Sequence, residues 1–476
     1  MHDELAFTPA LELARRIRAK ELSPVELVTA YLERIEALDP QINSYITVAA
    51  DQALAAAADA AEAVGGDELP PLHGIPIGIK DLIDTAGIRT TCATAAWRER
   101  VPAVDAAVVA KLRAAGCVIL GKHNTPEFAG GTFTEPLAYG ACRNPWNLQY
   151  SPGGSSGGSG AATAAGLCAL ALGSDDGGSI RIPSGWGGLV GIKPTRGRVS
   201  AAPEPSALYY TPGPMAHTVA DAAAMLDAIS GYVVGDAFWA PDPARPFLQE
   251  VGADPGRLRI AFTTAGADGV PIAPGNAAAV HATAQVLARL GHDVFEVDDW
   301  PGRGMFPDDR ALGLHAVYGV RFAALTDHGE MPPADTLEPG QQMLTMIGRD
   351  VKATDLFYAS YLEGKSARQI VAAFFDRWDV LLTPVIASQP TTIGEIQADP
   401  AKALGLLQSI QFTGQFSQTG QPAIAVPADV DGDGLPVGVQ LVGRPADEAT
   451  LIRVASQLEV AQPWAGRHPA LGGATT

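Results

Sequence analysis

The sequence is poor in cysteine and in long apolar runs, and both shortages narrow the classes of protein it can encode. Its four cysteines, Cys92, Cys117, Cys142 and Cys168, show no CxxC spacing. A disulfide scaffold is therefore excluded, and buried free thiols in a reducing compartment are expected. No apolar run is long enough to span a membrane, and the N-terminus has no apolar core of a signal peptide. We expect a cytoplasmic protein without membrane contact.

Positive charge is also scarce. The formal net charge is −19, and no basic stripe interrupts the acidic excess. Such a chain repels phosphate backbones, so nucleic-acid partners are excluded. The 47% hydrophobic and 18% charged residues are ordinary for a globular protein and give no sign of disorder.

Metal-ligating patterns are missing. The nine histidines are scattered, and none pairs at i, i+4 as zinc ligands do. The run 429–434, DVDGDG, imitates half of a calcium loop, but its twelfth position would be Gln440 instead of glutamate. We interpret the run as a hairpin turn and expect neither a metal site nor a cofactor.

The periodicity predicts an α/β protein. Buried strands alternate with helices, which favours a sheet covered on both faces, and residues 300–377 turn mainly helical. No repeat or linker is evident, so a single domain over 1–476 is expected, with a core at about 70–200. Expected helices begin at Thr8-Pro9 and Ser23 and cover 53–63, 105–115, 160–165, 218–231, 278–290 and 448–460; expected strands are 75–84, 117–120, 167–172, 258–262, 294–297, 380–385, 422–426 and 437–442.

The stretch 151–183 organises the chain. It reads as a Gly/Ser loop, an Ala-rich helix, an apolar strand and a second Gly-Gly-Ser loop at 175–179. Its apolar flanks exclude a flexible linker. Gly153 to Gly157 also matches the G-x-S-x-G nucleophile elbow, but that motif needs a buried strand before it, and the preceding residues form a loop. Two serine-bearing loops could thus face one pocket.

A serine nucleophile needs a base, and no histidine lies in or beside these loops. Lysine can replace histidine where burial disfavours its charged form. Lys80 lies in the apolar run GIPIGIK, which suits that role. The alternatives, a surface lysine or one paired with Asp81, stay open at this point.

The motifs GGSSGGS and DDGGSIRIPSGWGGLVGIKPTRGRVS, with the upstream GIPIGIKD, resemble the signature of the amidase signature family. The spacings from Lys80 to Ser155 and from Ser155 to Ser179 also match, and similarity extends through GKHNTPEF and RNPW to LPVGVQLVG. The resemblance covers nearly the whole chain. It implies the amidase-signature fold, a central mixed β-sheet sandwiched between layers of α-helices.

The resemblance further implies a Ser–Ser–Lys triad. Ser179 would attack the carbonyl carbon, Ser155 would relay its proton after a cis peptide, and Lys80 would be the base. The resemblance also implies further roles. Ser156 would steady the lysine, the amides of Asp176, Gly177, Gly178 and Ser179 would form an oxyanion hole, Asp175 and Arg181 would pair, and the loop at Ala129 would touch substrate.

Two positions depart from the family pattern. Asp176 stands where a small neutral or hydroxyl residue is usual, and Asn147 stands where aspartate is common. If the Asp176 carboxylate points inward, it would oppose the oxyanion or recognise a cationic substrate.

The resemblance implies a cofactor-free amidohydrolase that works through an acyl-enzyme on a small amide. Within the family, TRGRVS and GDAF look closest to bacterial amidases and 6-aminohexanoate cyclic-dimer hydrolases. Carbamate or ester hydrolysis at the same site, a non-catalytic scaffold and a glutamine amidotransferase subunit stay open as alternatives. So does a homodimer.

Residues 300–350 depart most from the α/β rhythm and contain five aromatic rings, those of Trp300, Phe306, His315, Tyr318 and Phe322. Elaborations on a rigid scaffold commonly carry specificity. We predict that this segment walls the acyl or leaving-group pocket.

Overall fold

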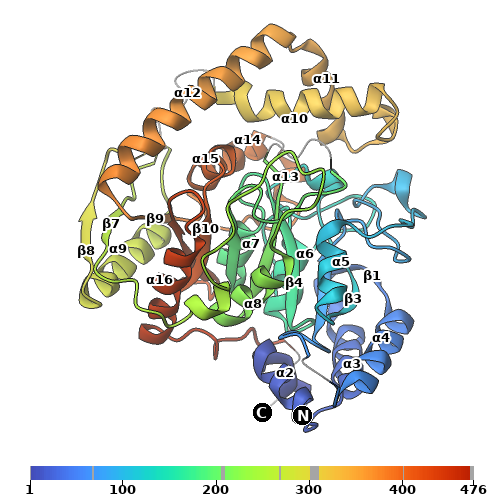
Figure 1. The fold of residues 1–476 in the computed structure, drawn as a ribbon. Coiled ribbons are helices and arrows are strands. Elements are labelled where there is room, and N and C mark those ends of the chain that lie inside the picture. The colour runs from blue at the N-terminus through green and yellow to red at the C-terminus, as the bar shows by residue number, and fades with distance from the viewer. Residues whose placement is uncertain are drawn as a thin grey trace.

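The computed structural model describes residues 2–66, 69–204, 209–266, 270–300, 310–399 and 401–471. Within these ranges, eleven strands join one mixed sheet in the order β1-β3-β2-β4-β6-β5-β10-β11-β9-β7-β8. Figure 1 shows this sheet among layers of helices, which confirms the predicted α/β architecture. The strands are β1 (Tyr45–Val48), β2 (Pro76–Lys80), β3 (Val118–His123), β4 (Leu170–Asp175), β5 (Val190–Lys193), β6 (Thr211–Ala216), β7 (Arg259–Phe262), β8 (Asp293–Glu296), β9 (Val380–Pro384), β10 (Ala423–Val430) and β11 (Pro436–Val442).

The helices pack on the sheet in groups. α6 packs against α7 and against β2 and β4, while α8 packs against α16 and β6. The helices are α1 (His2–Phe7), α2 (Ala10–Arg18), α3 (Pro24–Ile42), α4 (Ala50–Ala63), α5 (Ala107–Ala114), α6 (Gly157–Ala164), α7 (Arg181–Gly187), α8 (Val219–Ile229), α9 (Pro274–Arg289), α10 (Arg310–Asp327), α11 (Pro339–Asp350), α12 (Ala353–Arg377), α13 (Glu395–Ala398), α14 (Ala401–Ser409), α15 (Gln411–Gln418) and α16 (Glu448–Ala461).

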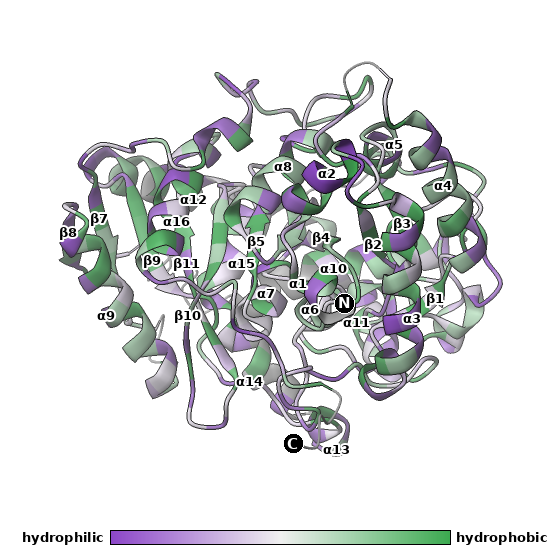
Figure 2. Ribbon diagram, turned by 90° about the horizontal axis from the view of Figure 1, so that it is seen from below, coloured by the Kyte–Doolittle hydropathy of each residue, from purple (hydrophilic) through white to green (hydrophobic). Residues whose placement is uncertain are grey.

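The core follows the strands. β2, β3, β4, β9 and β11 are buried along their whole length, and Figure 2 shows apolar residues concentrated in the sheet, with polar residues on the outer turns of the helices. Strands buried on both faces read as continuous apolar runs, which is why they could be recognised in the sequence.

The order of the first strands positions two loops together. β2 and β4 are parallel neighbours, with Ile77 opposite Leu170 and Ile79 opposite Leu172. Parallel neighbours end at the same edge of a sheet, and ligands bind at that edge in open α/β sheets. The residues at the ends of β2 and β4 therefore meet, and α6 starts beside them.

Helices α10, α11 and α12 form a helical arm at one end of the molecule (top of Figure 1). The arm is tied to the loop at 127–138 by two carboxylates. Glu127 accepts from the backbone N–H of Glu338 at 2.6 Å, and Glu338 accepts from that of Leu137, also at 2.6 Å. Phe322 of α10 adds an edge-to-face contact with Phe128. The expected helical elaboration at 300–377 is thus confirmed for its described part.

Several local predictions hold. Ser23 and Glu26 form the expected capping box, Thr218 caps α8, and 429–434 turns between the antiparallel strands β10 and β11. One cap is wrong. Asp105 does not cap α5, because its carboxylate instead accepts from the Ala86 amide and pairs with Arg113.

No helix in the part of the chain that the structure describes is both long and apolar enough to cross a membrane.

Candidate active site

Lys80 ends β2 with its side chain fully buried. Its ammonium nitrogen lies 2.7 Å from Ser155 Oγ and 3.0 Å from Ser174 Oγ. Burial lowers the pKa of Lys80 to about 7, against the opposing effect of the Asp176 and Asp175 carboxylates. The surface alternative is wrong. Asp81 is not its partner either, because that carboxylate accepts from Thr91 and Ala93.

Ser174 is a site residue that the sequence interpretation missed. Its hydroxyl contacts Lys80, a role that the resemblance gave to Ser156. Ser156 Oγ instead accepts from the Ser174 N–H and donates to the Ser174 carbonyl. Ser156 therefore steadies the lysine through Ser174, and the signal for this was the parallel register of β2 and β4.

Ser155 lies before α6, and the peptide bond from Gly154 to Ser155 is cis. Its side chain is 2% exposed, and Thr125 Oγ1 donates to its carbonyl at 2.8 Å. A Cβ on Gly154 would lie 2.7 Å from the Phe133 nitrogen, so only glycine allows the loop at 131–133 this close.

Ser179 lies in the loop between β4 and α7 and is partly exposed. Its carbonyl accepts from the Ser156 N–H at 3.2 Å, which places the two serine loops side by side. Among the hydrogen bonds of the described residues, none joins the hydroxyls of Ser155 and Ser179. The structure thus brings Lys80 to Ser155 directly and Ser179 to the same place through the backbone.

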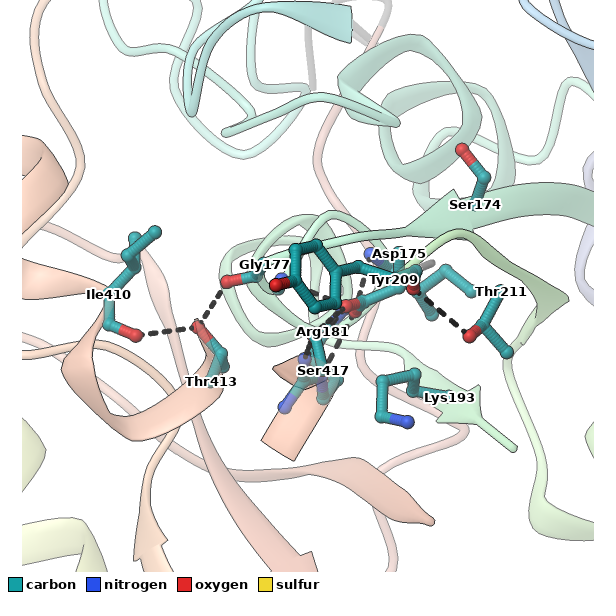
Figure 3. A network of polar contacts seen from close by, with 12 residues as sticks. Ser174, Asp175, Gly177, Arg181, Lys193, Tyr209, Thr211, Ile410, Thr413 and Ser417 are labelled. Carbon is teal, nitrogen blue, oxygen red and sulfur yellow. Dashed lines mark hydrogen bonds and ion pairs between the residues drawn. The ribbon is translucent and has the colours of Figure 1, made fainter. Parts of the chain in front are cut away.

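Asp175 and Arg181 form the expected buried pair, drawn in Figure 3. The guanidinium donates to both carboxylate oxygens, at 2.7 and 2.9 Å. Burial by itself raises the pKa of Asp175, yet Arg181 brings it down to about 2. The same carboxylate accepts from the amides of Gly178 and Ile180. The pair therefore holds both sides of the Ser179 loop.

The Gly178 amide was expected in the oxyanion hole, but it donates to Asp175 Oδ1 at 2.8 Å and so is already engaged. Within the described chain, the N–H groups of Gly177 and Ser179 donate no hydrogen bond. Gly178 is required for another reason. Its φ is +129°, and a Cβ there would lie 2.5 Å from Thr413 Oγ1.

Thr413, on α15, is a second residue that the sequence did not point to. Its hydroxyl contacts the Gly177 carbonyl at 2.6 Å and the Ile410 carbonyl at 3.1 Å, as Figure 3 shows. A helix about 230 residues away in sequence thus fixes the backbone before the nucleophile candidate. Ala129, the other predicted contact, is partly exposed, with φ +60°, at the end of the 3-10 turn Glu127–Ala129.

Asp176 points to the Lys80 side of the loop. Successive residues of an extended strand alternate, so Ser174 and Asp176 share one side while Asp175 faces Arg181. The Asp176 carboxylate accepts a hydrogen bond from Tyr318 of α10. Burial raises its pKa, although Arg321 and Lys80 act in the opposite direction. The helical arm therefore reaches the nucleophile loop.

The aromatic residues predicted to wall a pocket divide between core and site. Trp300 is 1% exposed and stacks on Phe412, so its ring belongs to the core. Tyr318 reaches Asp176, and Phe322 packs near Phe128. Phe306 and the His315 side chain lie outside the described residues. Asn147 accepts from the Gln149 amide within its own loop.

Histidines do not serve as an alternative base here. His73 contacts the Ala60 carbonyl and His217 the Thr163 carbonyl, so neither ring approaches the serines. Burial lowers the pKa of His123 to about 3, and that ring contacts Ser159. Across the described ranges, no group of three or more His, Cys, Asp or Glu side chains could hold a metal.

Comparison with known proteins places the site in a family context. The amidase family model matches residues 26–452. AmiB2 of Mycobacterium tuberculosis, described as a putative amidase, is 42% identical, over 98% of this chain and 99% of that protein. The 6-aminohexanoate-cyclic-dimer hydrolase of Paenarthrobacter ureafaciens is 36% identical, over 96% and 95%. A glutamyl-tRNA(Gln) amidotransferase subunit from Geobacter metallireducens is also 36% identical, over 95% and 97%.

Solved structures agree with these relatives. A 6-aminohexanoate cyclic dimer hydrolase complexed with substrate superposes with a TM-score of 0.91 at 34% identity, covering 98% of this chain and 99% of that one. The fold is therefore shared over nearly the full length of both chains.

Proposed function

The chain belongs to the amidase family of amide hydrolases, and on that premise we propose that it cleaves a carboxamide C–N bond through an acyl-enzyme. Ser179 is the nucleophile, Ser155 the proton relay and Lys80 the base. The observation that carries the proposal is the 2.7 Å contact between the buried Lys80 nitrogen and Ser155 Oγ. Burial with a pKa of about 7 leaves much of Lys80 neutral at physiological pH.

The bonds and protons balance in two half-reactions. Neutral Lys80 takes the Ser155 proton while Ser155 takes that of Ser179, and Ser179 Oγ attacks the carbonyl carbon. The oxyanion forms beside the N–H groups of Gly177 and Ser179. The C–N bond then breaks, and the Lys80 ammonium returns its proton through Ser155 to the leaving amine. Water hydrolyses the ester by the same relay.

The test removes each hydroxyl in turn. Ser179→Ala should lower kcat at least about 10⁴-fold and abolish labelling by a fluorophosphonate, while Ser155→Ala should be severe but incomplete. Ser184→Ala is the matched control, because that buried hydroxyl on α7 has no hydrogen-bond partner among the described residues. Substantial turnover by Ser179→Ala, or a label mapped by mass spectrometry to another serine, would refute the assignment.

The chemical class of the scissile bond needs a substrate panel. Ester and carbamate carbonyls can use the same serine and relay. Similarity to an amidotransferase subunit supports glutamine, as an ammonia source, as a further candidate. Rates on aliphatic amides, anilides, carbamates, esters and glutamine would rank these alternatives. A non-catalytic scaffold predicts no turnover of any of them.

A further inference from the structure

Asp176 is the charged group beside the proposed nucleophile that the proposed mechanism leaves unused. Its Oδ1 is buried and, among the described residues, has no hydrogen-bond partner. The residue as a whole keeps partial exposure, so a ligand could still reach it. A buried carboxylate oxygen without a partner is costly unless something pairs with it.

The surrounding charges do not neutralise it. Arg321 is nearby, but its guanidinium pairs with Glu204 at 2.8 Å. Lys80, the other cation near the carboxylate, must be neutral when the reaction starts. Two carboxylates and one guanidinium leave one negative charge in this cluster, which comprises Asp176, Glu204 and Arg321.

That charge also bears on catalysis. The oxyanion would form at the amides that follow Asp176 directly, and a carboxylate this close opposes negative charge on the carbonyl oxygen. A cation placed between the two would remove the opposition. Tyr318 steadies the carboxylate from α10 but carries no charge to offset it.

We propose that Asp176 is a specificity residue that selects substrates with one primary ammonium group close to the scissile amide. The inference rests on the proposed amidohydrolase function and adds its substrate class. The ammonium pairs with Asp176 Oδ1, restores electroneutrality to the cluster and relieves the oxyanion. Neutral amides of the same shape lack both effects.

The kinetic test compares isosteric pairs on both sides of the amide. Aminoacyl p-nitroanilides with one to five methylenes are matched with simple acyl p-nitroanilides, and N-acetyl-1,4-diaminobutane is matched with N-pentylacetamide. We expect the best cationic member to exceed its neutral partner at least about 10-fold in kcat/KM. Asp176→Asn should reduce that ratio to below about 3 and raise the rate on neutral substrates. Asp355→Asn, the same charge change on the exposed face of α12, should leave the ratio unchanged.

A binding measurement keeps the outcome independent of turnover. Butylammonium should bind the wild type more tightly than Asp176→Asn in calorimetry at fixed salt, with Asp355→Asn like the wild type. Equal rates on all pairs, or a preference that survives Asp176→Asn, would overturn the inference while leaving amide hydrolysis intact. Turnover that survives Ser179→Ala would instead overturn the proposed mechanism.

Discussion

Lys80 can act as a base because folding removes its ammonium from water. The apolar run around it made its burial predictable, and the resemblance gave its role. Ser174 could not be found in the same way, since its contact with Lys80 depends on the register of two strands about 90 residues apart. Side-chain partners across a parallel pair are fixed by topology, which local sequence does not encode.

Activity should follow the neutral fraction of Lys80. Its pKa of about 7 lies below the 10.5 of an exposed lysine, so kcat/KM should rise with pH up to about 7 and level above it. Lys80→Ala should abolish the reaction, and Lys80→His should not rescue it, because the ring is too short to reach Ser155. The check is a profile from pH 5 to 10. A profile already flat from about pH 5.5 would point to another base.

The same burial should cost stability in a defined pH window. The unfolded chain keeps the Lys80 proton up to about pH 10.5 while the folded chain loses it near 7, so this group's penalty is full below pH 7 and fades toward 10.5. Lys80→Met should therefore unfold at higher denaturant, by about 1–3 kcal/mol at pH 6, and the gain should shrink by pH 9.5. Lys352→Met, at an exposed position, is the control. A gain independent of pH would contradict this reading of Lys80.

At the scale of elements, strands with continuous apolar runs were predictable and those broken by proline or glycine were not. β6 reads TPGPMA, yet it lies inside the sheet between β4 and β5. Pro212 and Pro214 are two apart, so both lack a donor toward the same side, and β5 pairs only beyond them at Met215 and Ala216. α7 was missed because Pro183 and two glycines interrupt it.

α15 should influence catalysis through one hydroxyl. Thr413→Val keeps the shape but removes the contact with the Gly177 carbonyl. We expect kcat to fall about 3–10-fold with KM nearly unchanged, and stability to fall by about 1 kcal/mol. Thr283→Val is the matched control, since that buried hydroxyl donates only to the Ala279 carbonyl on α9. A loss of stability without any loss of kcat would show that the loop needs no support from α15.

At the scale of the whole molecule, the sequence predicted the layers but not the strand order. β5 pairs with β10, about 230 residues later, and β9 separates β11 from β7. Such long-range pairings follow from the packing of the complete sheet. The single domain over 1–476, the cytoplasmic compartment and the option of a homodimer stay predictions.

The four cysteines provide a test of the whole fold. Cys92, Cys117, Cys142 and Cys168 are free and buried, and burial raises the pKa of each thiol. Only thiolates react quickly with disulfide reagents, so the native protein should resist Ellman's reagent for hours. In guanidinium chloride without reductant, four thiols per chain should react at once. Reductant should leave Tm unchanged, because no disulfide closes a loop among the described residues. Fewer than four thiols after denaturation would reveal a disulfide, and rapid reaction of the native protein would mean that the β2–β4 region opens far more readily than its packing implies.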